Sequence, residues 1–477
     1  MRPSFNVLNA PWIPVVTLNG TKELLGIRDT LRRAPELKEI SVVSPLEEFS
    51  VYRFLSVFLM DALRPKRTSA IKKLLKQGCF DMEQIEEYIS LCEEEGVSFD
   101  LFDKERPFLQ SFPEEKATAK SIANLDYFLP SGNNHLHFDH ELTDHRIISS
   151  DQAARLLLTV QQFCTAGTQG PSGVNAAPPY FGVVKADTLF GTLVYSLLPI
   201  QAIEIPFDDP KVIWRSNDPV VPKMDVSQTS WLRGMLFPAR IVRLVPPKED
   251  MQIMQVYLGA GENYIHKDVW TDPHVSYRFS KTGRFPFRPK KEKPVWRNMS
   301  DIININGNNA SQLLTQYIRL SDSPYAKVTL YGVATNNASY LDVMRHDLYF
   351  RKDLAENDEA LDLLKRCIES SDSLAKTIHS CLRGKKIVPE TVASDAVNYF
   401  YEECEKKFWK LCEICLVDGT MQSHYCNWCQ SIGQFAQDAF SKALQNVNLR
   451  GKDLGRAAQQ QKWLSVEIKK IKEDAQV

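Results

Sequence analysis

The sequence has no apolar run long enough to span a membrane, and its first residues, MRPSFNVLNAPW, lack the features of a signal peptide. These absences predict a cytoplasmic protein with no membrane partner. Net charge is also nearly absent, since 58 Lys and Arg face 59 Asp and Glu, giving −1. The surface as a whole is therefore not that of a polyanion binder. Any contact with nucleic acid must come from a local patch or from partners.

Common nucleotide-binding and catalytic signatures are missing as well. Gly167, Gly170 and Gly173 lie in a predicted loop, Thr165–Tyr180, but no Lys-Ser/Thr follows them, and their spacing is not that of a Rossmann fingerprint. No nucleophile–base pair and no paired carboxylates stand out. Glycines let a backbone approach a ligand closely. Two interpretations of this loop stay open: a backbone that lies against a phosphate chain or a groove, and a flexible turn.

The ten cysteines, without a signal peptide, predict thiols or metal ligands rather than disulfides. Two CxxC pairs, Cys412/Cys415 and Cys426/Cys429, fall in the last turn of one predicted helix and the first turn of the next. Antiparallel helices bring such turns together, which favours a structural zinc clip. Cys415 and Cys429 also fit buried helical stripes, where a free Cys packs as a small hydrophobe.

A second candidate metal site lies in a polar stretch with four histidines. His135, His137, Asp139 and His140 match HxHxDH, the metal signature of the metallo-β-lactamase superfamily, and predict as an alternative function a metal-dependent hydrolase. That fold needs the motif after a buried strand, whereas the loop-like residues Leu129–Asn134 precede it here. A solvated polar loop is therefore the competing interpretation.

The length of 477 residues is too great for one hydrophobic core and predicts more than one domain. Residues 1–355 mix short strands, turns and helices. Ser44-Pro45-Leu46-Glu47 forms a capping box that opens an apolar helix towards Leu63. Phe190–Val194 reads as a strand. The fold class predicted for this domain is α+β, with helices against small sheets.

Residues 356–477 carry apolar residues at helical spacing throughout. Four amphipathic stripes begin near Leu361, Val397, Tyr425 and Ala457 and are joined by short loops. This pattern predicts a C-terminal antiparallel four-helix bundle.

The segment Thr329–Phe350 divides the mixed part from the helical part. Thr329–Val333 reads as a short strand, and Thr335–Asn337 as a polar turn between that strand and a helix. The amides of Asn336 and Asn337 both donate and accept hydrogen bonds, so they suit base edges or phosphates. A simple Asx-turn connector is the alternative.

The most basic stretch runs from Lys281 to Arg297. Cations interleaved with aromatic residues suit a nucleic-acid backbone, whereas a solvated strand edge is the usual alternative. Its members are Lys281, Arg284, Phe285, Phe287, Arg288, Lys290, Lys291, Lys293, Trp296 and Arg297.

Several segments, taken in this order, resemble the CasA family, the large subunit of the type I-E CRISPR Cascade complex. They are FNVLNAPWIPV at Phe5–Val15, WLRGMLFP at Trp231–Pro238, WTDPH at Trp270–His274, and NNAS at Asn336–Ser339 followed by RHD at Arg345–Asp347. The resemblance covers essentially the whole chain.

The resemblance implies a subunit that is not an enzyme and requires no cofactor, while the two CxxC pairs leave structural zinc open. Its partners would be the other Cascade subunits, the crRNA, double-stranded target DNA and a helicase–nuclease effector. Guide pairing reads the target, while the protein reads the short protospacer-adjacent motif (PAM) and helps to open the duplex.

The resemblance also implies roles for individual residues. Ala166–Gly173 occupies the place of the family's minor-groove glycine loop, and Lys267 is the candidate for its lysine finger. Phe138 fits the anchoring Phe of the family's first loop. The family's wedge carries Gln after an Asn pair, and here Asn337 is the nearest substitute.

Overall fold

The computed structural model describes residues 3–476 except 126–145, 166–169, 217–219, 248–251, 268, 282, 292, 337–338, 384–386 and 418. No helix of this described part is both long and apolar enough to cross a membrane. The chain divides into two compact units. The first comprises Met1–Lys291, Ser311–Asp322 and Ala326–Leu348, and the second comprises Glu292–Ala310, Ser323–Tyr325 and Tyr349–Val477. The predicted domain boundary at residues 355 and 356 stays a prediction.

The first unit combines helices with small sheets. Its helices are α1 (Ile27–Arg32), α2 (Pro45–Leu63), α3 (Thr68–Gln77), α4 (Met82–Glu94), α5 (Ser150–Gln162), α6 (Leu189–Tyr195), α7 (Trp231–Met235) and α9 (Gln312–Leu320). Its strands are β1 (Ile13–Thr17), β2 (Lys22–Leu25), β3 (Leu37–Ile40), β4 (Lys120–Ser121), β5 (Ile148–Ser149), β6 (Phe181–Lys185), β7 (Asp225–Val226), β8 (Arg240–Leu244), β9 (Gln252–Ile253), β10 (Gln255–Ala260), β11 (Asn263–Tyr264), β12 (Tyr277–Ser280) and β13 (Gly283–Pro286). The long strands β14 (Tyr325–Asn336) and β15 (Ser339–Arg351) belong mostly to it.

The sheets are small and almost entirely antiparallel. Three of them have three strands, in the orders β2-β1-β3, β4-β10-β8 and β15-β14-β6. The two-stranded sheets are β5-β9, β12-β13 and the parallel pair β7-β11. The predicted α+β class is confirmed.

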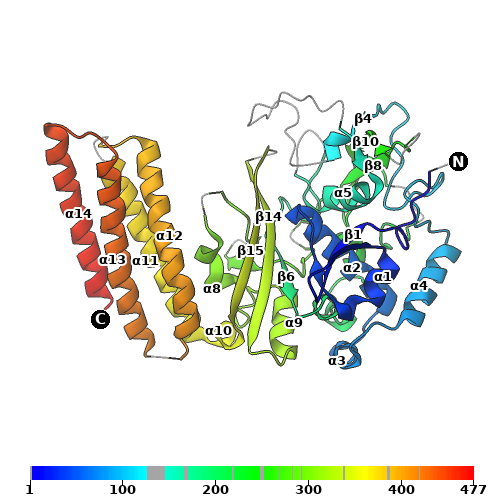
Figure 1. Cartoon of the computed structure of the whole chain (residues 1–477), viewed down its shortest axis with the longest axis horizontal. Helices are drawn as coiled ribbons and strands as arrows, with labels where there is room; N and C mark the ends of the chain where they lie inside the picture. Colours follow the sequence, from blue (N-terminus) through cyan, green and yellow to red (C-terminus); the bar gives the residue numbers. More distant parts are fainter. Residues whose placement is uncertain are drawn as a thin grey trace. The chain divides into compact units, whose positions relative to one another are not determined.

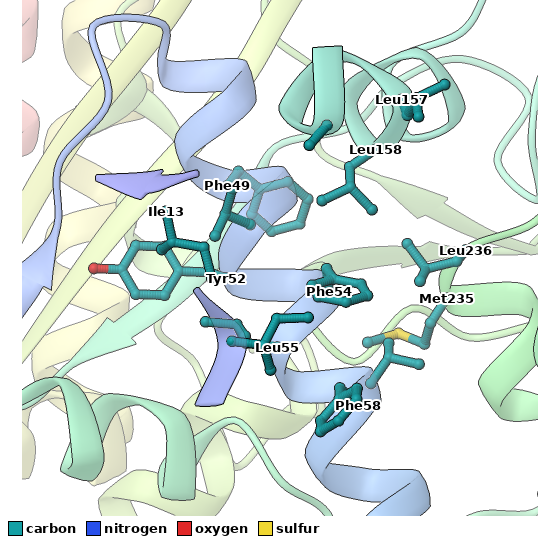
Figure 2. Close-up of a cluster of buried hydrophobic side chains, with 14 of the residues drawn as sticks. Ile13, Phe49, Tyr52, Phe54, Leu55, Phe58, Leu157, Leu158, Met235 and Leu236 are labelled. Carbon is teal, nitrogen blue, oxygen red and sulfur yellow. The ribbon is translucent and has the colours of Figure 1, made fainter. Parts of the chain in front are cut away.

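Helix α2 forms the centre of the core (Figures 1 and 2). It begins as predicted, because the Ser44 side chain accepts a hydrogen bond from the Glu47 amide at 3.3 Å and Pro45 occupies the first turn. Every residue from Leu46 to Asp61 is buried. A helix buried on all sides belongs to the interior of a large domain. Figure 2 shows its aromatic side chains in one cluster with Ile13 of β1, Leu157 and Leu158 of α5, and Met235 of α7.

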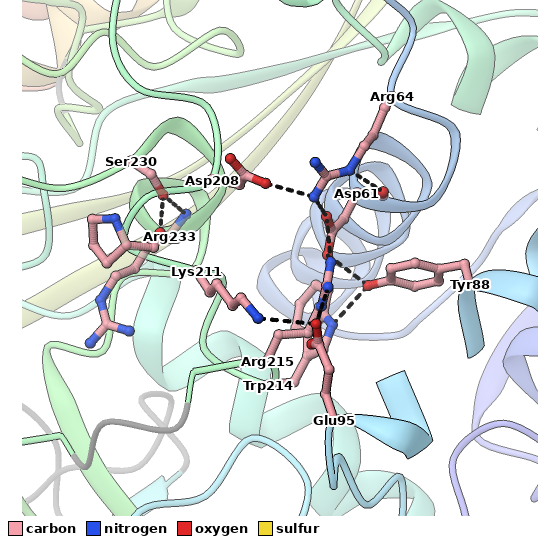
Figure 3. A network of polar contacts seen from close by, with 11 residues as sticks. Asp61, Arg64, Tyr88, Glu95, Asp208, Lys211, Trp214, Arg215, Ser230 and Arg233 are labelled. Atoms are coloured by element: carbon pink, nitrogen blue, oxygen red, sulfur yellow. Dashed lines mark hydrogen bonds and ion pairs between the residues drawn. The ribbon is translucent and has the colours of Figure 1, made fainter. Parts of the chain in front are cut away.

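A buried ionic network ties α2 to α4 (Figure 3). Arg215 donates to the Asp61 carboxylate at 3.0 Å and to the Glu95 carboxylate at 2.7 Å. The Tyr88 hydroxyl donates to Asp61 at 2.9 Å. Hydrogen bonding to Arg215, the largest cause, lowers the pKa of Glu95 to about 2. The network fixes the end of α4 and the loop around Arg215 against the core.

Two elements differ from the sequence-based expectation. The strand predicted at Phe190–Val194 is wrong, because these residues lie in helix α6, where the Thr188 side chain caps the Gly191 amide at 3.1 Å. A short apolar run fits a buried strand or a buried helix equally well. Here the Thr188 cap favours the helix. The helix predicted after the Asn turn is also wrong. Thr335 and Asn336 of the predicted turn end β14, and residues Ser339–Arg351 form β15, which pairs with β14.

The second unit contains the predicted bundle (Figure 1). Its four long helices are α11 (Asp358–Arg383), α12 (Glu390–Ile414), α13 (Met421–Gln445) and α14 (Lys452–Asp474), preceded by the short helices α8 (Met299–Ile302) and α10 (Lys352–Glu356). Trp296 also belongs to this core. Its ring is fully buried, with its centroid 5.0 Å from that of Phe408 and 6.4 Å from that of Trp428.

Candidate nucleic-acid interface

A buried arginine holds both ends of the glycine loop, here defined as Thr165–Gly173. Arg240 of β8 donates from Nη2 to the Thr165 carbonyl at 2.7 Å and from Nη1 to the Pro171 carbonyl. Its side chain is 2% exposed. The planar guanidinium presents several donors in a fixed geometry. One residue of the β8 strand therefore sets the separation of the two ends of the loop.

The described glycines of this loop have different structural requirements. Gly170 has φ +123°, and a Cβ built there would lie 2.7 Å from the Ala260 Cβ and 2.8 Å from its Cα. Only glycine fits both the dihedral and the space. At Gly173 a Cβ would meet only ordinary contacts at 3.7 Å. Gly167 lies outside the described residues.

The structure places Lys267 beside this loop, whereas its role as a lysine finger stays a prediction. Its Nζ donates to the Ser172 hydroxyl and lies 3.5 Å from the Ser172 carbonyl oxygen. Burial lowers the pKa of Lys267, and the nearby charge of Arg240 lowers it further. A partly buried amine thus stands at the exit of the glycine loop.

The β14–β15 hairpin reaches the other end of the same loop. The Tyr340 hydroxyl, near the start of β15, donates to the Phe163 carbonyl at 3.0 Å and accepts from the Thr165 hydroxyl at 3.4 Å. Asn336 is exposed at the end of β14. Asn337 lies outside the described residues. The base of the Asn turn and the glycine loop are therefore neighbours.

The hairpin is anchored to the core through Glu48 of α2. This carboxylate accepts hydrogen bonds from the Tyr331 hydroxyl and from Lys185 Nζ, the latter at 3.4 Å, and pairs with Arg345 Nε at 3.5 Å. Burial outweighs the neighbouring carboxylates and lowers the pKa of Lys185 to about 8. Burial, and then the charge of Glu48, raise the pKa of Tyr331. Both strands of the hairpin are thus fixed at one buried acid.

The basic stretch divides between the two units. Lys290 and Lys291 are exposed and follow Pro289, whose ring packs against Gly332 of β14. Trp296 is buried in the bundle core, and Arg297 pairs with Asp372 at 2.8 Å. Only the first part of the stretch is therefore placed to meet a ligand.

Other predicted site residues lie outside the described residues. Phe138 is one of them, and its role stays a prediction. The same holds for His135, His137, Asp139 and His140 of the hydrolase alternative. In the part of the chain that the structure describes, no three His, Cys, Asp or Glu side chains gather as metal ligands.

The four bundle cysteines are packed as thiols. Cys412, Cys415 and Cys429 are buried, and Cys426 Sγ donates to the Ala475 carbonyl at 2.9 Å. Burial raises the pKa of Cys415 and of Cys429 to about 11. Because α13 begins at Met421, Cys426 and Cys429 lie beyond its first turn, contrary to the prediction. Structural zinc stays a prediction, which a metal analysis of freshly purified protein tests.

A mixed α+β unit with a four-helix bundle is the architecture of a class of CRISPR-associated proteins whose solved structures share this fold. The family model described as CRISPR-associated protein Cse1 matches residues 6–444. The chain therefore belongs to the Cse1 family, and the resemblance seen in the sequence motifs is confirmed.

Individual relatives agree with this assignment. CasA/Cse1 of Thermus thermophilus is 27% identical over 428 residues, which cover 84% of this chain and 82% of the relative. A crystal structure of Thermus thermophilus CasA gives a TM-score of 0.77 at 22% identity, covering 98% of this chain and 100% of that one. Thermobifida fusca Cse1 gives 0.79 at 16% identity, covering 99% of each chain. A chain of a CRISPR RNA-guided surveillance complex gives 0.80 at 17% identity, covering 98% of this chain and 99% of that one.

Sequence reasoning missed the residues that position the site. Arg240, Glu48 and Tyr340 are far apart in the chain and carry no motif. Arg240 alone left a signal, as a charged residue next to the apolar Ile241 and Val242 of a short strand. Buried charges are rare and need partners, so such a residue suggests a positioning role.

Proposed function

We propose that this chain is the non-catalytic, DNA-inspecting large subunit of a crRNA-guided Cascade complex. In this role it recognises the PAM in duplex DNA, aids opening of the duplex and recruits the effector helicase–nuclease. Family membership supports the general role. The observation that carries the DNA-inspecting role is the meeting of the glycine loop, Lys267 and the base of the Asn turn within one unit.

Each part has a chemistry suited to duplex DNA. A glycine-rich loop can approach a narrow minor groove, and the Lys267 amine beside it donates to groove acceptors. A polar turn at the end of a rigid hairpin is suited to enter an unstacked base step. Exposed Lys290 and Lys291 supply phosphate contacts next to β14.

The proposed partners are the other Cascade subunits and crRNA. A near-neutral subunit suits this assembly, because the guide RNA and the partners supply much of the interaction. The similarity in fold to a chain of an RNA-guided surveillance complex supports it. Co-purification of crRNA with the tagged chain from its native host tests this part, and a pull-down free of crRNA would contradict it.

The DNA-inspecting role is tested in the assembled complex. Binding to duplexes that share one target but differ in the flanking motif should depend on the motif only when this chain is present. A complex that discriminates equally well without the chain would overturn the proposal. A nuclease and esterase screen of the metal-analysed protein tests the absence of catalysis, and turnover that depends on His135 would support the hydrolase instead.

A further inference from the structure

The β12–β13 hairpin exposes two aromatic rings. Phe279 is 56% exposed and Phe285 is 40% exposed, although both belong to paired strands. Phe279 faces Arg284 across the hairpin, and Phe285 faces Arg278. Residues directly opposite each other share a face of a sheet, so the rings lie on opposite faces, each beside an arginine.

The base of this hairpin is fixed to the core. The Tyr277 hydroxyl accepts from the Asp272 amide at 3.0 Å, and the Phe287 amide donates to the Ser276 carbonyl at 3.2 Å. Arg284 donates to the Thr271 hydroxyl at 2.6 Å, and its guanidinium lies 4.6 Å from the Tyr277 ring centroid. The exposed rings therefore lie on a hairpin whose base is already ordered. This order reduces the conformational entropy lost when a ligand binds.

The surroundings of the rings are strongly cationic. Residues 273–291 include six Lys and Arg and no Asp or Glu. None of the ion pairs formed among the described residues includes Arg278, Lys281 or Arg288. Partial burial and then the like charge of Arg278 lower the pKa of Arg288. Positive charge beside exposed rings complements an anion that also carries flat apolar groups.

We propose that the β12–β13 hairpin binds single-stranded nucleic acid, with bases stacked on Phe279 and Phe285 and phosphates held by Arg278, Lys281 and Arg288. Cations combined with stacking aromatics are the usual means of binding single strands without sequence preference. In a duplex the base faces are already stacked on each other, so the rings have no partner there. Lysine is depleted in the core of protein–protein interfaces, so the presence of Lys281 between the rings argues against a protein as the occupant.

The pairing register of the hairpin suggests the path of a bound nucleic-acid strand. Ser280 and Gly283 close the hairpin beyond Phe279. A nucleic-acid strand that passes round this end meets Phe279 on one face of the hairpin and Phe285 on the other face. Each ring then contributes separately. This proposal goes beyond PAM recognition and does not require it.

The test uses the full-length chain and labelled oligothymidine of about 20 nucleotides, which has no secondary structure, with a duplex of equal length as comparison. Phe279→Ala and Phe285→Ala should each weaken binding to oligothymidine about tenfold, because a stacked base is lost. Duplex binding should not change. Phe112→Ala, which removes a ring 60% exposed outside the hairpin, is the matched control and should change neither.

Further variants separate stacking from other causes. Phe285→Trp should retain binding, whereas Phe285→Leu, which keeps apolar area but not the ring, should lose it. Arg278→Gln with Arg288→Gln should reduce the salt slope by about 0.7 for each lost phosphate contact. Unchanged affinity of the double Phe→Ala variant, equal losses on single strand and duplex, or full retention by Phe285→Leu would each overturn the proposal. Unchanged thermal melting shows that every variant is folded, and none of these results bears on motif recognition.

Discussion

At the scale of single residues, buried charges act as connectors between segments distant in sequence. Arg240 joins the two ends of the glycine loop, and Glu48 joins α2 to both strands of the hairpin. Burying a charge is costly unless it is paired and hydrogen-bonded. Each of these side chains is therefore expected to be sensitive to substitution although neither is placed in contact with a ligand.

Gly170→Ala should destabilise the first unit by about 1–3 kcal/mol or more, since it places a side chain at positive φ against Ala260. Gly173→Ala is the matched control. Because that site has room, it should leave the free energy of unfolding unchanged or raise it by up to about 1 kcal/mol. Chemical denaturation measures both. Equal stability of the two variants would contradict the geometry at Gly170.

The structure also changes how DNA-binding data on Gly170 are interpreted. Gly170→Val should weaken binding of motif-bearing duplex while sparing assembly, because its β-branched side chain blocks the approach of the loop to the groove. A clash with Ala260 gives a second cause of loss. A loss of DNA binding at unchanged melting temperature supports the groove contact, and unchanged affinity for target duplex removes the loop from the site.

Stability should rise with pH above about pH 8, because the pKa of Lys185 is lowered from 10.5 to about 8. Between these values the unfolded chain binds more protons than the folded one, so the slope is positive, up to about 1.4 kcal/mol per pH unit. Above about pH 10 the raised pKa of Tyr331 and of Tyr52 acts in the opposite direction, since the folded protein keeps those protons. Denaturation at several pH values should show a flatter rise in Lys185→Met. If the free energy of unfolding rises equally steeply with pH in Lys185→Met, groups other than Lys185 cause the pH dependence.

At the scale of elements, the β14–β15 hairpin is the element that links the core to the proposed wedge. Its strands continue from the Glu48 anchor to the exposed Asn336. A strand advances about 3.4 Å per residue, so Asn336 at the end of β14 lies well beyond the anchor at Tyr331. A stiff support of this kind allows a short polar turn to act on a duplex.

Asn337→Ala should slow duplex opening on linear targets. Unstacking a base step costs a few kcal/mol, and a side chain that bonds the exposed edges offsets part of this cost. Negative supercoiling should partly restore the rate. Binding to a target with a pre-opened bubble should barely change, and equal losses on linear and bubbled targets would leave Asn337 as a plain contact or a structural turn residue.

Lys290→Ala with Lys291→Ala should weaken binding to all duplexes alike. Phosphate contacts carry no sequence information, so the salt slope should flatten by about 0.9 for each lost contact. Titrations at several salt concentrations on two PAM sequences provide the measurement. A loss confined to one PAM sequence would contradict a backbone role.

Local signals in the sequence predicted most elements but not their pairing. The helix start at Ser44 and the apolar stripes of α11 to α14 depend on neighbouring residues, and these predictions are confirmed. The strand β15 depends on pairing with β14, which no local pattern of Tyr340–Phe350 reveals. The candidate site shows the same limit. Gly170 and Lys267 were singled out from sequence, whereas Arg240, which holds the loop, is visible only after folding.

At the scale of the whole molecule, the units are not consecutive pieces of chain. The chain passes between them after Lys291, Ala310, Asp322, Tyr325 and Leu348. The helical periodicity marked the long helices, but it could not show that Trp296, more than sixty residues before α11, fills their core.

Trp296→Ala should destabilise the second unit by about 3–5 kcal/mol, because it leaves a cavity beside Phe408 and Trp428. Trp463→Ala, which removes a ring 59% exposed on α14, is the matched control and should cost less than about 0.5 kcal/mol. Thermal unfolding followed by far-ultraviolet circular dichroism compares them. Similar melting curves for the two variants would contradict the assignment of Trp296 to the core.

Because the chain passes several times between the two units, cleavage of its backbone has a predictable result. A protease cut between residues 311 and 348 would leave the second unit with part of its packing on each fragment, namely residues 292–310 on one side and 349–477 on the other. The nicked molecule should migrate as a single particle in a native gel and separate into two bands only in detergent. A gene split at residue 356 would place Trp296 on a different fragment from α11 to α14, so the bundle expressed alone would lack this core side chain.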